Sequence, residues 1–448
     1  MADRGSTALL TDHYELTMLA ASLRDGMAHR PAVFEVFARS LPRGRRYGVF
    51  AGLGRLLDAI DDFKFGRDEL SFLRRRGFLD EATLEFLDGY RFEGDVVSYR
   101  EGEVYVPWSP VLTVEASFAE AVLLETLILS ILNHDTAVAS AASRMVGAAD
   151  GRRLLEMGGR RTHEFAAVAA ARAAFVAGFD ATSNLEASRR YGIPTAGTAA
   201  HAFTLAHDDE RAAFASQLDA LGVGTTLLVD TYDIPTAIRT AVDLARGRGA
   251  TGPGAIRIDS GDLVDETRRA RALLDELGAY DTRIVVSGDL DEYVIEELVE
   301  CRAPIDSFGV GTRVVSGSGH PTASFVYKLV AIDGRPVAKR SAGKATVGGR
   351  KRAWRDVVDG TARAEHVAAW PERFDEADEH DGRHGRPLQV LAIRGGRRLH
   401  DPSNDDIRAR HRESVAELDH MARMTVAGEP AFVVTDPTIS PASEEEHP

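Results

Sequence analysis

The amino-acid sequence predicts an α/β protein built around a (β/α) barrel. Short apolar segments recur through the middle of the chain, and each leads into a polar or glycine-rich turn and then a helical stretch. Their starts lie about 18 to 33 residues apart, which is the length of one strand with its returning helix. Polar side chains follow these segments, and a barrel forms its active site at that end of its strands. A doubly wound open sheet is the alternative arrangement of the same units.

The first part of the chain, residues 1–112, is predicted to form a small α+β domain. Residues 31–41 and 94–108 alternate apolar and polar side chains as strands do, and residues 68–90 have helical periodicity. This part therefore differs from the repeating strand–helix pattern that follows it.

The barrel domain is predicted over residues 113–332, which hold eight candidate strands. These are 153–157, 174–179, 193–197, 226–230, 255–259, 283–287, 307–311 and 325–332. Residues 333–448 have weaker periodicity, and we expect a disordered tail from about residue 438, where acidic residues and proline dominate. The chain is thus expected to have three parts.

Composition excludes several classes of protein. A chain of 448 residues is too long for one ordinary core, and its net charge of −15 argues against nucleic acid as a partner. A single cysteine, Cys301, forms no disulfide within the chain and fits a reducing cytosol. The most apolar helical stretch, residues 118–132, contains Glu120 and Glu125 and is shorter than the roughly 20 residues that span a bilayer. We therefore expect a cytoplasmic protein that binds neither nucleic acid nor membranes.

Residues suited to binding anions follow the predicted strands. Arg160 and Arg257 offer bidentate donors for a carboxylate or phosphate, and the Gly309–Thr312 turn brings several backbone N–H groups together. Asp259 could hold a ribose hydroxyl or a magnesium ion. Taken singly, each such turn is more often a helix cap, and His201 alone would be an ordinary packed histidine. The basic run 339–355 could contact phosphates or form a surface loop.

Six motifs in order, between residue 11 and about residue 355, resemble nicotinate phosphoribosyltransferases. They are TDHYELTM (11–18), TSN (182–184), AGTAAHAF (196–203), LLVDTYD (227–233), IRIDSGDL (256–263), and IDSFGVGT (305–312) with VYKLV (326–330). The resemblance implies an irregular (β/α) barrel of the type II phosphoribosyltransferase fold. In that fold the C-terminal segment, here residues 333–448, packs on the N-terminal α+β domain and completes it. A homodimer with active sites shared between subunits is also implied.

The resemblance further implies a reaction of NAD biosynthesis by salvage. Nicotinate and 5-phosphoribosyl 1-diphosphate would give nicotinate mononucleotide and diphosphate, with Mg²⁺ present and ATP hydrolysis coupled through a phosphohistidine. His201 matches the histidine that is phosphorylated in this family. A neutral imidazole can attack the γ-phosphate of ATP, and the small residues before His201 leave room for phosphate and ribose.

Other roles are implied by position within the same motifs. Tyr14 resembles the ring that stacks on the pyridine, provided by the neighbouring subunit. Arg257 and Arg160 together resemble the residues that pair with the anionic groups of the substrates, the nicotinate carboxylate and phosphate. Asp259 resembles the group that holds ribose hydroxyls or Mg²⁺. We expect His201, Arg257 and Asp259 to be catalytic, and the remaining substrate-binding residues to be Thr198, Ser260, Gly261, Asp262 and the 5-phosphate cradle Gly309, Gly311 and Thr312.

Ser183 bears on the choice of substrate. Nicotinamide-specific relatives carry a carboxylate at the matching position, which accepts from the amide, whereas a serine hydroxyl can donate to the carboxylate of nicotinate. The acid is therefore the expected substrate. A nicotinamide or quinolinate phosphoribosyltransferase is one alternative, and a non-catalytic barrel that senses a nucleotide is another.

Overall fold

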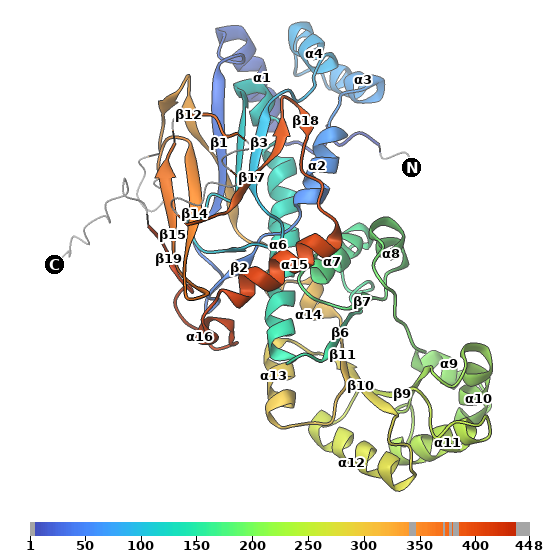
Figure 1. The fold of residues 1–448 in the computed structure, drawn as a ribbon. Helices are drawn as coiled ribbons and strands as arrows, with labels where there is room; N and C mark the ends of the chain where they lie inside the picture. Colours follow the sequence, from blue (N-terminus) through green and yellow to red (C-terminus); the bar gives the residue numbers. More distant parts are fainter. Residues whose placement is uncertain (1–4, 340–345, 371, 376–378, 380–384, 436–448) are drawn as a thin grey trace, which may run out of the picture. The chain divides into compact units, whose positions relative to one another are not determined.

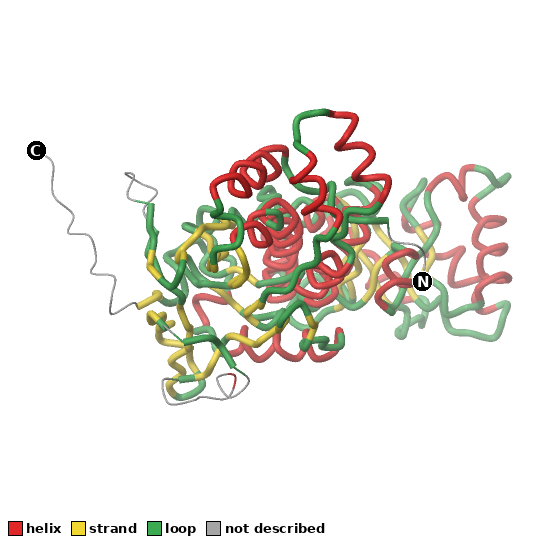
Figure 2. The backbone as a smooth tube through the Cα atoms, turned by 90° about the horizontal axis from the view of Figure 1, so that it is seen from above, coloured by secondary structure: helices red, strands yellow, loops and turns green. Residues whose placement is uncertain are grey.

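The computed structural model describes residues 5–339, 346–370, 372–375, 379 and 385–435, and Figure 1 shows the course of the chain. Helices and strands both occur throughout, which confirms the α/β class (Figure 2). The chain divides into two compact units, one of residues 1–137 with 322–448 and one of residues 138–321. The tail expected from about residue 438 lies outside the described residues.

A seven-stranded sheet that draws on both ends of the chain forms the centre of the first unit. Its order is β13-β12-β1-β5-β3-β17-β18. Strand β1 lies antiparallel between β5 and β12, and β17 pairs antiparallel with β3. The strands are β1 (Pro31–Ala38), β3 (Asp95–Tyr99), β5 (Leu112–Ser117), β12 (Phe325–Ile332), β13 (Arg335–Pro336), β17 (Gln389–Arg394) and β18 (Arg397–Arg398). Strands from the C-terminal part of the chain, such as β17, therefore belong to the same sheet as strands from the N-terminal part, such as β3.

Residues 325–332 correct one strand prediction. They form β12 in this antiparallel sheet and not a strand of the parallel sheet. The Tyr327 ring stacks on Phe34 of β1 at 4.7 Å, and its hydroxyl donates to the carbonyl of Ala121. Because the segment reads as an apolar strand in either setting, only these contacts with distant residues decide its sheet.

Helices pack on this sheet and bury its apolar face. Stretch 118–132, expected to be a buried helix, forms α5 and the start of α6, where Leu127, Ile128 and Leu132 are buried. Among the described residues, no helix has both the length and the apolar character needed to cross a membrane. The helices of the first unit are α1 (His13–Asp25), α2 (Leu53–Asp61), α3 (Arg67–Arg76), α4 (Glu81–Asp88), α5 (Phe118–Val122), the part of α6 (Glu125–Ala148) up to residue 137, α15 (Asn404–Ala416) and α16 (His420–Arg423).

A buried ion cluster joins two smaller sheets of the first unit. Arg355 of β14 is fully buried and pairs with Glu365 of β15 at 2.9 Å and with Glu103 at 3.5 Å. Burial alone would raise the pKa of Glu103, but neighbouring arginines outweigh it and lower the pKa to about 2. The sheets comprise β14 (Lys351–Val358), β15 (Thr361–Ala369), β16 (Arg386–Pro387) and β19 (Val433–Thr435), and β2 (Gly48–Val49) with β4 (Val104–Tyr105). Arg355, the last residue of the basic run 339–355, thus has a structural role.

The second unit contains a curled, parallel, six-stranded sheet of order β7-β6-β11-β10-β9-β8, a half-barrel (Figure 1). Its strands are β6 (Arg153–Glu156), β7 (Ala181–Thr182), β8 (Thr226–Leu228), β9 (Ala255–Ile258), β10 (Arg283–Gly288) and β11 (Ser307–Val310). The connecting helices are α7 (Glu164–Val176), α8 (Leu185–Tyr191), α9 (His201–Leu205), α10 (Glu210–Leu221), α11 (Ile234–Arg246), α12 (Leu263–Glu276), α13 (Glu292–Glu300) and α14 (Thr312–Val315).

Two further strand predictions are wrong. Residues 174–179 belong to the end of α7 and the turn after it, because the alanine-rich stretch favours helix up to Val176. The strand begins only at Ala181. Residues 193–197 contribute a single bridge between Thr195 and Thr182 and no regular strand.

Candidate functional site

Most of the predicted site residues lie at one edge of the half-barrel sheet. The carboxyl ends of parallel strands meet at the same edge, so the loops after β8, β9, β10 and β11 converge there. Hydrogen bonds connect five of the predicted residues, directly or through one further side chain: Thr198, His201, Arg257, Asp259 and Ser260.

Arg257 organises one half of this cluster. Its Nη1 donates to the Thr198 hydroxyl at 2.5 Å, and its Nε donates to the Ser287 hydroxyl at 3.0 Å. The Ser287 hydroxyl in turn donates to Asp259, whose Oδ1 lies 3.5 Å from Arg257 Nη2. These contacts hold the guanidinium of Arg257 in one orientation, as bidentate recognition of an anion requires.

Asp230 organises the other half and was not among the predicted site residues. Its carboxylate is almost fully buried and lies 3.2 Å from His201 Nε2. The other oxygen accepts from the backbone N–H of Asp259 and from the Ser260 hydroxyl, both at 2.8 Å. The signal in the sequence was its position inside the LLVDTYD motif, directly after a buried strand.

The His201–Asp230 contact fixes the tautomer of the imidazole. A carboxylate only accepts hydrogen bonds, so the proton sits on Nε2 and the lone pair of the neutral ring sits on Nδ1. The His201 side chain is 42% exposed, so reagents can approach it. Nearby, burial together with Asp233 and Asp230 raises the pKa of Glu210 to about 7, which limits the negative charge close to the pair.

The remaining loop residues have structural roles that the geometry explains. Asp262 caps α12 by accepting from the N–H groups of Val264 and Asp265, and Gly261 has a φ of +89°. A Cβ on Gly309 would lie 2.8 Å from Met157 Sδ, so close packing requires glycine there. Thr312 begins α14, a helix of only four residues. Roles of these residues in binding phosphate stay predictions.

Arg160 and Ser183 lie on neighbouring loops that follow β6 and β7. Both residues are exposed, and the Ser183 N–H donates to the carbonyl of Glu156 at 2.8 Å. The two loops approach each other, since a Cβ on Gly159 would lie 3.8 Å from Asn184 Nδ2. Exposed donors on adjacent loops are suited to an anionic group, although no contact brings Arg160 into the Arg257 cluster.

Tyr14 belongs to the first unit and is the second residue of α1. The residue is 43% exposed, while burial of the phenol and the nearby Glu125 and Glu15 raise the pKa of Tyr14 to about 12. The ring therefore stays neutral at physiological pH and presents an exposed aromatic surface. Its stacking role stays a prediction.

Asp259 is the residue best suited to Mg²⁺. Its Oδ1 is engaged by Ser287 and Arg257, and its Oδ2 has no hydrogen bond to a residue that the structure describes. The described part of the chain contains no cluster of three or more metal-ligating side chains. Mg²⁺ nevertheless needs only one or two carboxylates when phosphates and water complete its shell, so these residues fit an ion that arrives with a phosphorylated substrate.

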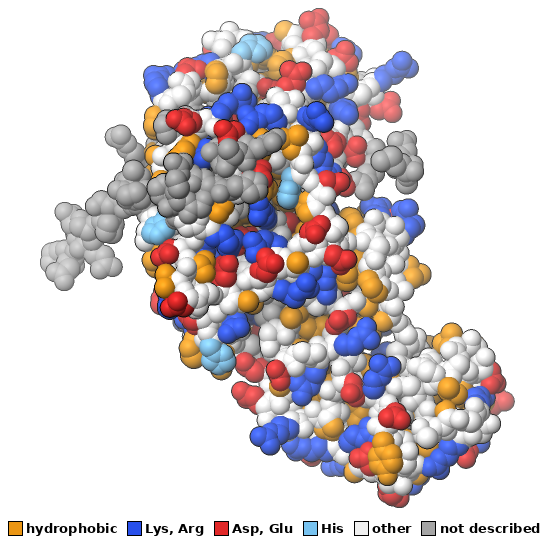
Figure 3. Space-filling model, viewed as in Figure 1, with side chains coloured by type: hydrophobic (Ala, Val, Ile, Leu, Met, Phe, Trp, Pro, Cys, Tyr) orange, Lys and Arg blue, Asp and Glu red, His pale blue; other side chains and the backbone are white. Residues whose placement is uncertain are grey.

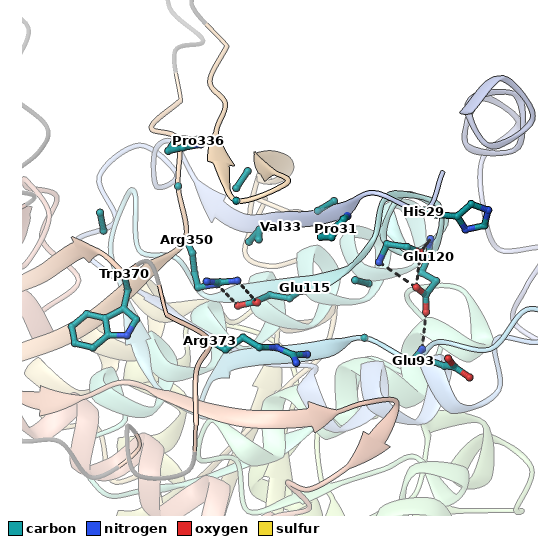
Figure 4. Close-up of a pocket in the computed structure, with 18 residues that line it drawn as sticks. His29, Pro31, Val33, Glu93, Glu115, Glu120, Pro336, Arg350, Trp370 and Arg373 are labelled. Atoms are coloured by element: carbon teal, nitrogen blue, oxygen red, sulfur yellow. Dashed lines mark hydrogen bonds and ion pairs between the residues drawn. The ribbon is translucent and has the colours of Figure 1, made fainter. Parts of the chain in front are cut away.

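A cavity of about 790 Å³ in the first unit is a separate feature (Figure 4). Arg350 on its wall forms a bidentate pair with Glu115, and Glu120 accepts from the N–H of Glu93. Arg373, also on the wall, pairs with Asp95 at 2.6 Å. Because these charges already have partners and no predicted site residue lines the cavity, it is not the candidate active site.

The surface carries charges of both signs. On the face drawn in Figure 3, acidic and basic side chains are interspersed over the described residues.

Comparison with known sequences places the chain in one family. The nicotinate phosphoribosyltransferase (NAPRTase) N-terminal domain matches residues 9–133, and the nicotinate phosphoribosyltransferase (NAPRTase) family matches residues 153–362. The chain is 56% identical to nicotinate phosphoribosyltransferase pncB1 of Mycobacterium tuberculosis over 95% of this chain and 94% of that relative. It is 38% identical to nicotinate phosphoribosyltransferase of Bacillus subtilis over 83% of this chain and 78% of that relative. The crystal structure of human nicotinic acid phosphoribosyltransferase matches with a TM-score of 0.79 and 25% identity, covering 95% and 97% of the two chains.

Proposed function

The chain belongs to the nicotinate phosphoribosyltransferase family, and we propose that it joins nicotinate to 5-phosphoribosyl 1-diphosphate, using ATP through a phosphohistidine at His201. The products are nicotinate mononucleotide and diphosphate, made for NAD biosynthesis by salvage. The observation that carries the proposal is the connected cluster of His201, Asp230, Arg257 and Asp259 at the carboxyl edge of the half-barrel sheet.

The chemistry of pentosyl transfer suits a site of this composition. The pyridine nitrogen of nicotinate is already a nucleophile, so the displacement at the anomeric carbon needs no strong general base. The site must align two anionic substrates and stabilise the leaving diphosphate. Arg257, held by Thr198 and Ser287, supplies an oriented cation for an anionic group. The positions of Arg160 and Ser183 on adjacent loops support recognition of the nicotinate carboxylate.

The same geometry supports phosphorylation of His201. Asp230 holds the Nε2 proton and leaves Nδ1 as the nucleophile for the γ-phosphate of ATP. The bond between that phosphorus and the bridging oxygen of ADP breaks as the Nδ1–phosphorus bond forms. The buried carboxylate also stabilises the positive charge that develops on the ring during attack. Water later removes the phosphoryl group and returns the neutral imidazole.

Two parts of the proposal concern groups outside this chain. Asp259, with its unengaged Oδ2, would hold Mg²⁺ beside the phosphates, and the ion would offset their negative charge. We also propose a homodimer in which Tyr14 of one subunit stacks on the pyridine bound by its partner. The support for this role is the exposed, neutral ring of Tyr14.

The test is an assay of mononucleotide and ADP. Purified protein is incubated with 5-phosphoribosyl 1-diphosphate and Mg²⁺, with nicotinate or nicotinamide, and with or without ATP. The proposal expects mononucleotide from nicotinate, faster with ATP, and ADP release that is lost in His201→Ala. Product from nicotinamide instead would overturn the assignment of the acid, and wild-type ADP release by His201→Ala would overturn the phosphohistidine.

A further inference from the structure

Glu156, the last residue of β6, is a buried carboxyl group that the proposed chemistry leaves without a role. It is 1% exposed, and no ion pair links it to any residue that the structure describes. A buried carboxylate without a cation is costly unless hydrogen bonds satisfy it, and burial does raise the pKa of Glu156. We therefore expect the hydrogen bonds of this carboxyl group to hold neighbouring parts of the chain in place.

The contacts of Glu156 reach two loops. Its Oε2 accepts from the Thr182 hydroxyl, and its Oε1 accepts from the backbone N–H of Gly158. Its own carbonyl accepts from the N–H of Ser183 at 2.8 Å. Thr182 continues the connection, because its oxygen accepts from the N–H of Asn184 at 3.0 Å. One side chain therefore fastens the loop after β6 to the loop after β7.

Close packing around Gly158 makes this fastening specific. A Cβ at Gly158 would lie 2.9 Å from Glu156 Oε1, 3.0 Å from the carbonyl oxygen of Gly311 and 2.2 Å from a methyl carbon of Val315. The backbone at Gly158 thus lies directly against the carboxyl group, with the loop after β11 on its other side. Arg160 lies two residues beyond Gly158, and Ser183 directly follows Thr182.

We infer that Glu156 is a positioning residue that sets the separation of Arg160 and Ser183 and thereby the affinity for nicotinate. The inference rests on the proposed function, in which these two side chains recognise the pyridine carboxylate. Glu156 is buried below the loops and touches no substrate, so it acts only through Gly158 and Thr182. It should affect nicotinate more than 5-phosphoribosyl 1-diphosphate, since the Glu156 side chain accepts from Gly158 and Thr182 and, among the described residues, makes no hydrogen bond to the Arg257 cluster or to the Gly309–Thr312 turn.

A carboxylate at the opposite end of the same two strands provides a matched control. Asp180 precedes β7 and accepts from the N–H of Leu154 at 2.9 Å, while its own N–H donates to the Leu154 carbonyl. It ties β6 to β7 as Glu156 does, but at the amino edge of the sheet. Asp180→Asn therefore reports the general cost of weakening this strand pair.

The experiment compares Glu156→Gln, Thr182→Val and Asp180→Asn in the full-length protein. Each has nearly the shape of the original side chain, and either of the first two suffices if the other does not fold. We expect KM for nicotinate to rise about tenfold in Glu156→Gln and Thr182→Val, with KM for 5-phosphoribosyl 1-diphosphate changed less than about twofold. Asp180→Asn should leave the ratio of the two KM values as in the wild type. The double variant Glu156→Gln/Thr182→Val should show less than the sum of the single effects, because both remove one connection.

Amide hydrogen exchange gives a readout independent of turnover. Peptides covering 158–161 and 182–184 should exchange faster in Glu156→Gln than in the wild type or in Asp180→Asn. An unchanged nicotinate KM, or a proportional change in both KM values, would overturn the inference. Failure of the proposed function looks different, because the wild-type protein would then form no mononucleotide from nicotinate. Unchanged exchange in Glu156→Gln would overturn the fastening of the loops whatever the reaction.

Discussion

Replacing Asp230 with asparagine should abolish phosphorylation of His201 while leaving the fold intact. One oxygen of the Asp230 carboxylate accepts from the backbone N–H of Asp259 and from the Ser260 hydroxyl. The other oxygen contacts His201 Nε2. The N–H of Asp259 can only donate, so the amide oxygen of an asparagine must face it. The NH₂ group then faces Nε2, which must be an acceptor. The proton moves to Nδ1, and the nucleophile that the proposal requires is lost.

The size of the effect follows from the contacts that change. A hydrogen bond to a charged group contributes about 1.5–3 kcal/mol, and each 1.4 kcal/mol is a factor of ten, so losing the contact between Asp230 and His201 costs roughly 10- to 150-fold. The reversed tautomer adds to this, since it removes the reactive lone pair as well as the charge. We therefore expect the rate of phosphoryl transfer to fall by at least about 100-fold.

Transfer of radiolabel from γ-labelled ATP to the protein measures this step directly. Asp233→Asn is the control, because Asp233 lies three residues away, caps α11 by accepting from the N–H of Thr236, and makes no contact with His201. It should label at the wild-type rate. Labelling of folded Asp230→Asn at the wild-type rate would refute the role of the carboxylate in fixing the tautomer.

Two further predictions concern stability. Burial raises the pKa of Glu15 to about 7, above its unfolded value, although Thr126 donates to its carboxylate. The contribution of protonated Glu15 to the stability of the fold is therefore lost as pH rises from about 4.5 through 7. The thermal midpoint of the wild type should accordingly fall relative to that of Glu15→Gln between pH 5 and pH 8, and a constant difference would contradict this. Gly158→Ala should lower the midpoint by several degrees, because overpacking costs about 1–3 kcal/mol, whereas Gly159→Ala, whose Cβ would meet only Asn184 Nδ2 at an ordinary contact distance of 3.8 Å, should not. Equal midpoints for the two variants would contradict the packing argument.

The sequence was informative about the half-barrel site because strand ends can be read from local patterns. Once apolar segments of a parallel sheet are located, the residues after them must lie at one edge. This logic placed Arg257 and Asp259 at one edge without any knowledge of pairings, and the structure connects them through hydrogen bonds with Ser287. His201 was expected after residues 193–197, which form no regular strand, and it is connected to the same edge through Asp230. The α/β class and the family were predictable for the same reason, since motifs and strand spacing are local properties.

Pairing between distant segments was not predictable in this way. Residues 325–332 read as one more apolar strand, and only contacts with β1 and Ala121 show that they belong to the other sheet. Asp230 and Ser287 resemble ordinary polar residues at strand ends, and their importance depends on which residues of neighbouring segments donate to them. Glu156 was part of a predicted strand, and nothing local distinguishes a buried carboxyl that fastens loops from an exposed one.

The carboxylates at this edge of the half-barrel sheet would repel anionic substrates, but the structure provides them with hydrogen-bond donors. Asp230 accepts from an N–H and a hydroxyl, Asp259 accepts from Ser287 and lies close to Arg257, and Glu156 accepts from Thr182 and Gly158. Donors therefore offset the charge that would otherwise repel phosphate and nicotinate. The same hydrogen bonds help to fix the side chains of His201 and Arg257 and the loop that carries Ser183. The acidic residues thus act as the framework on which cationic and neutral donors are presented to the substrates. On this view, neutral isosteres at Asp230 and Glu156 weaken catalysis by reversing or losing hydrogen bonds of this framework, even though they remove negative charge from an anion site.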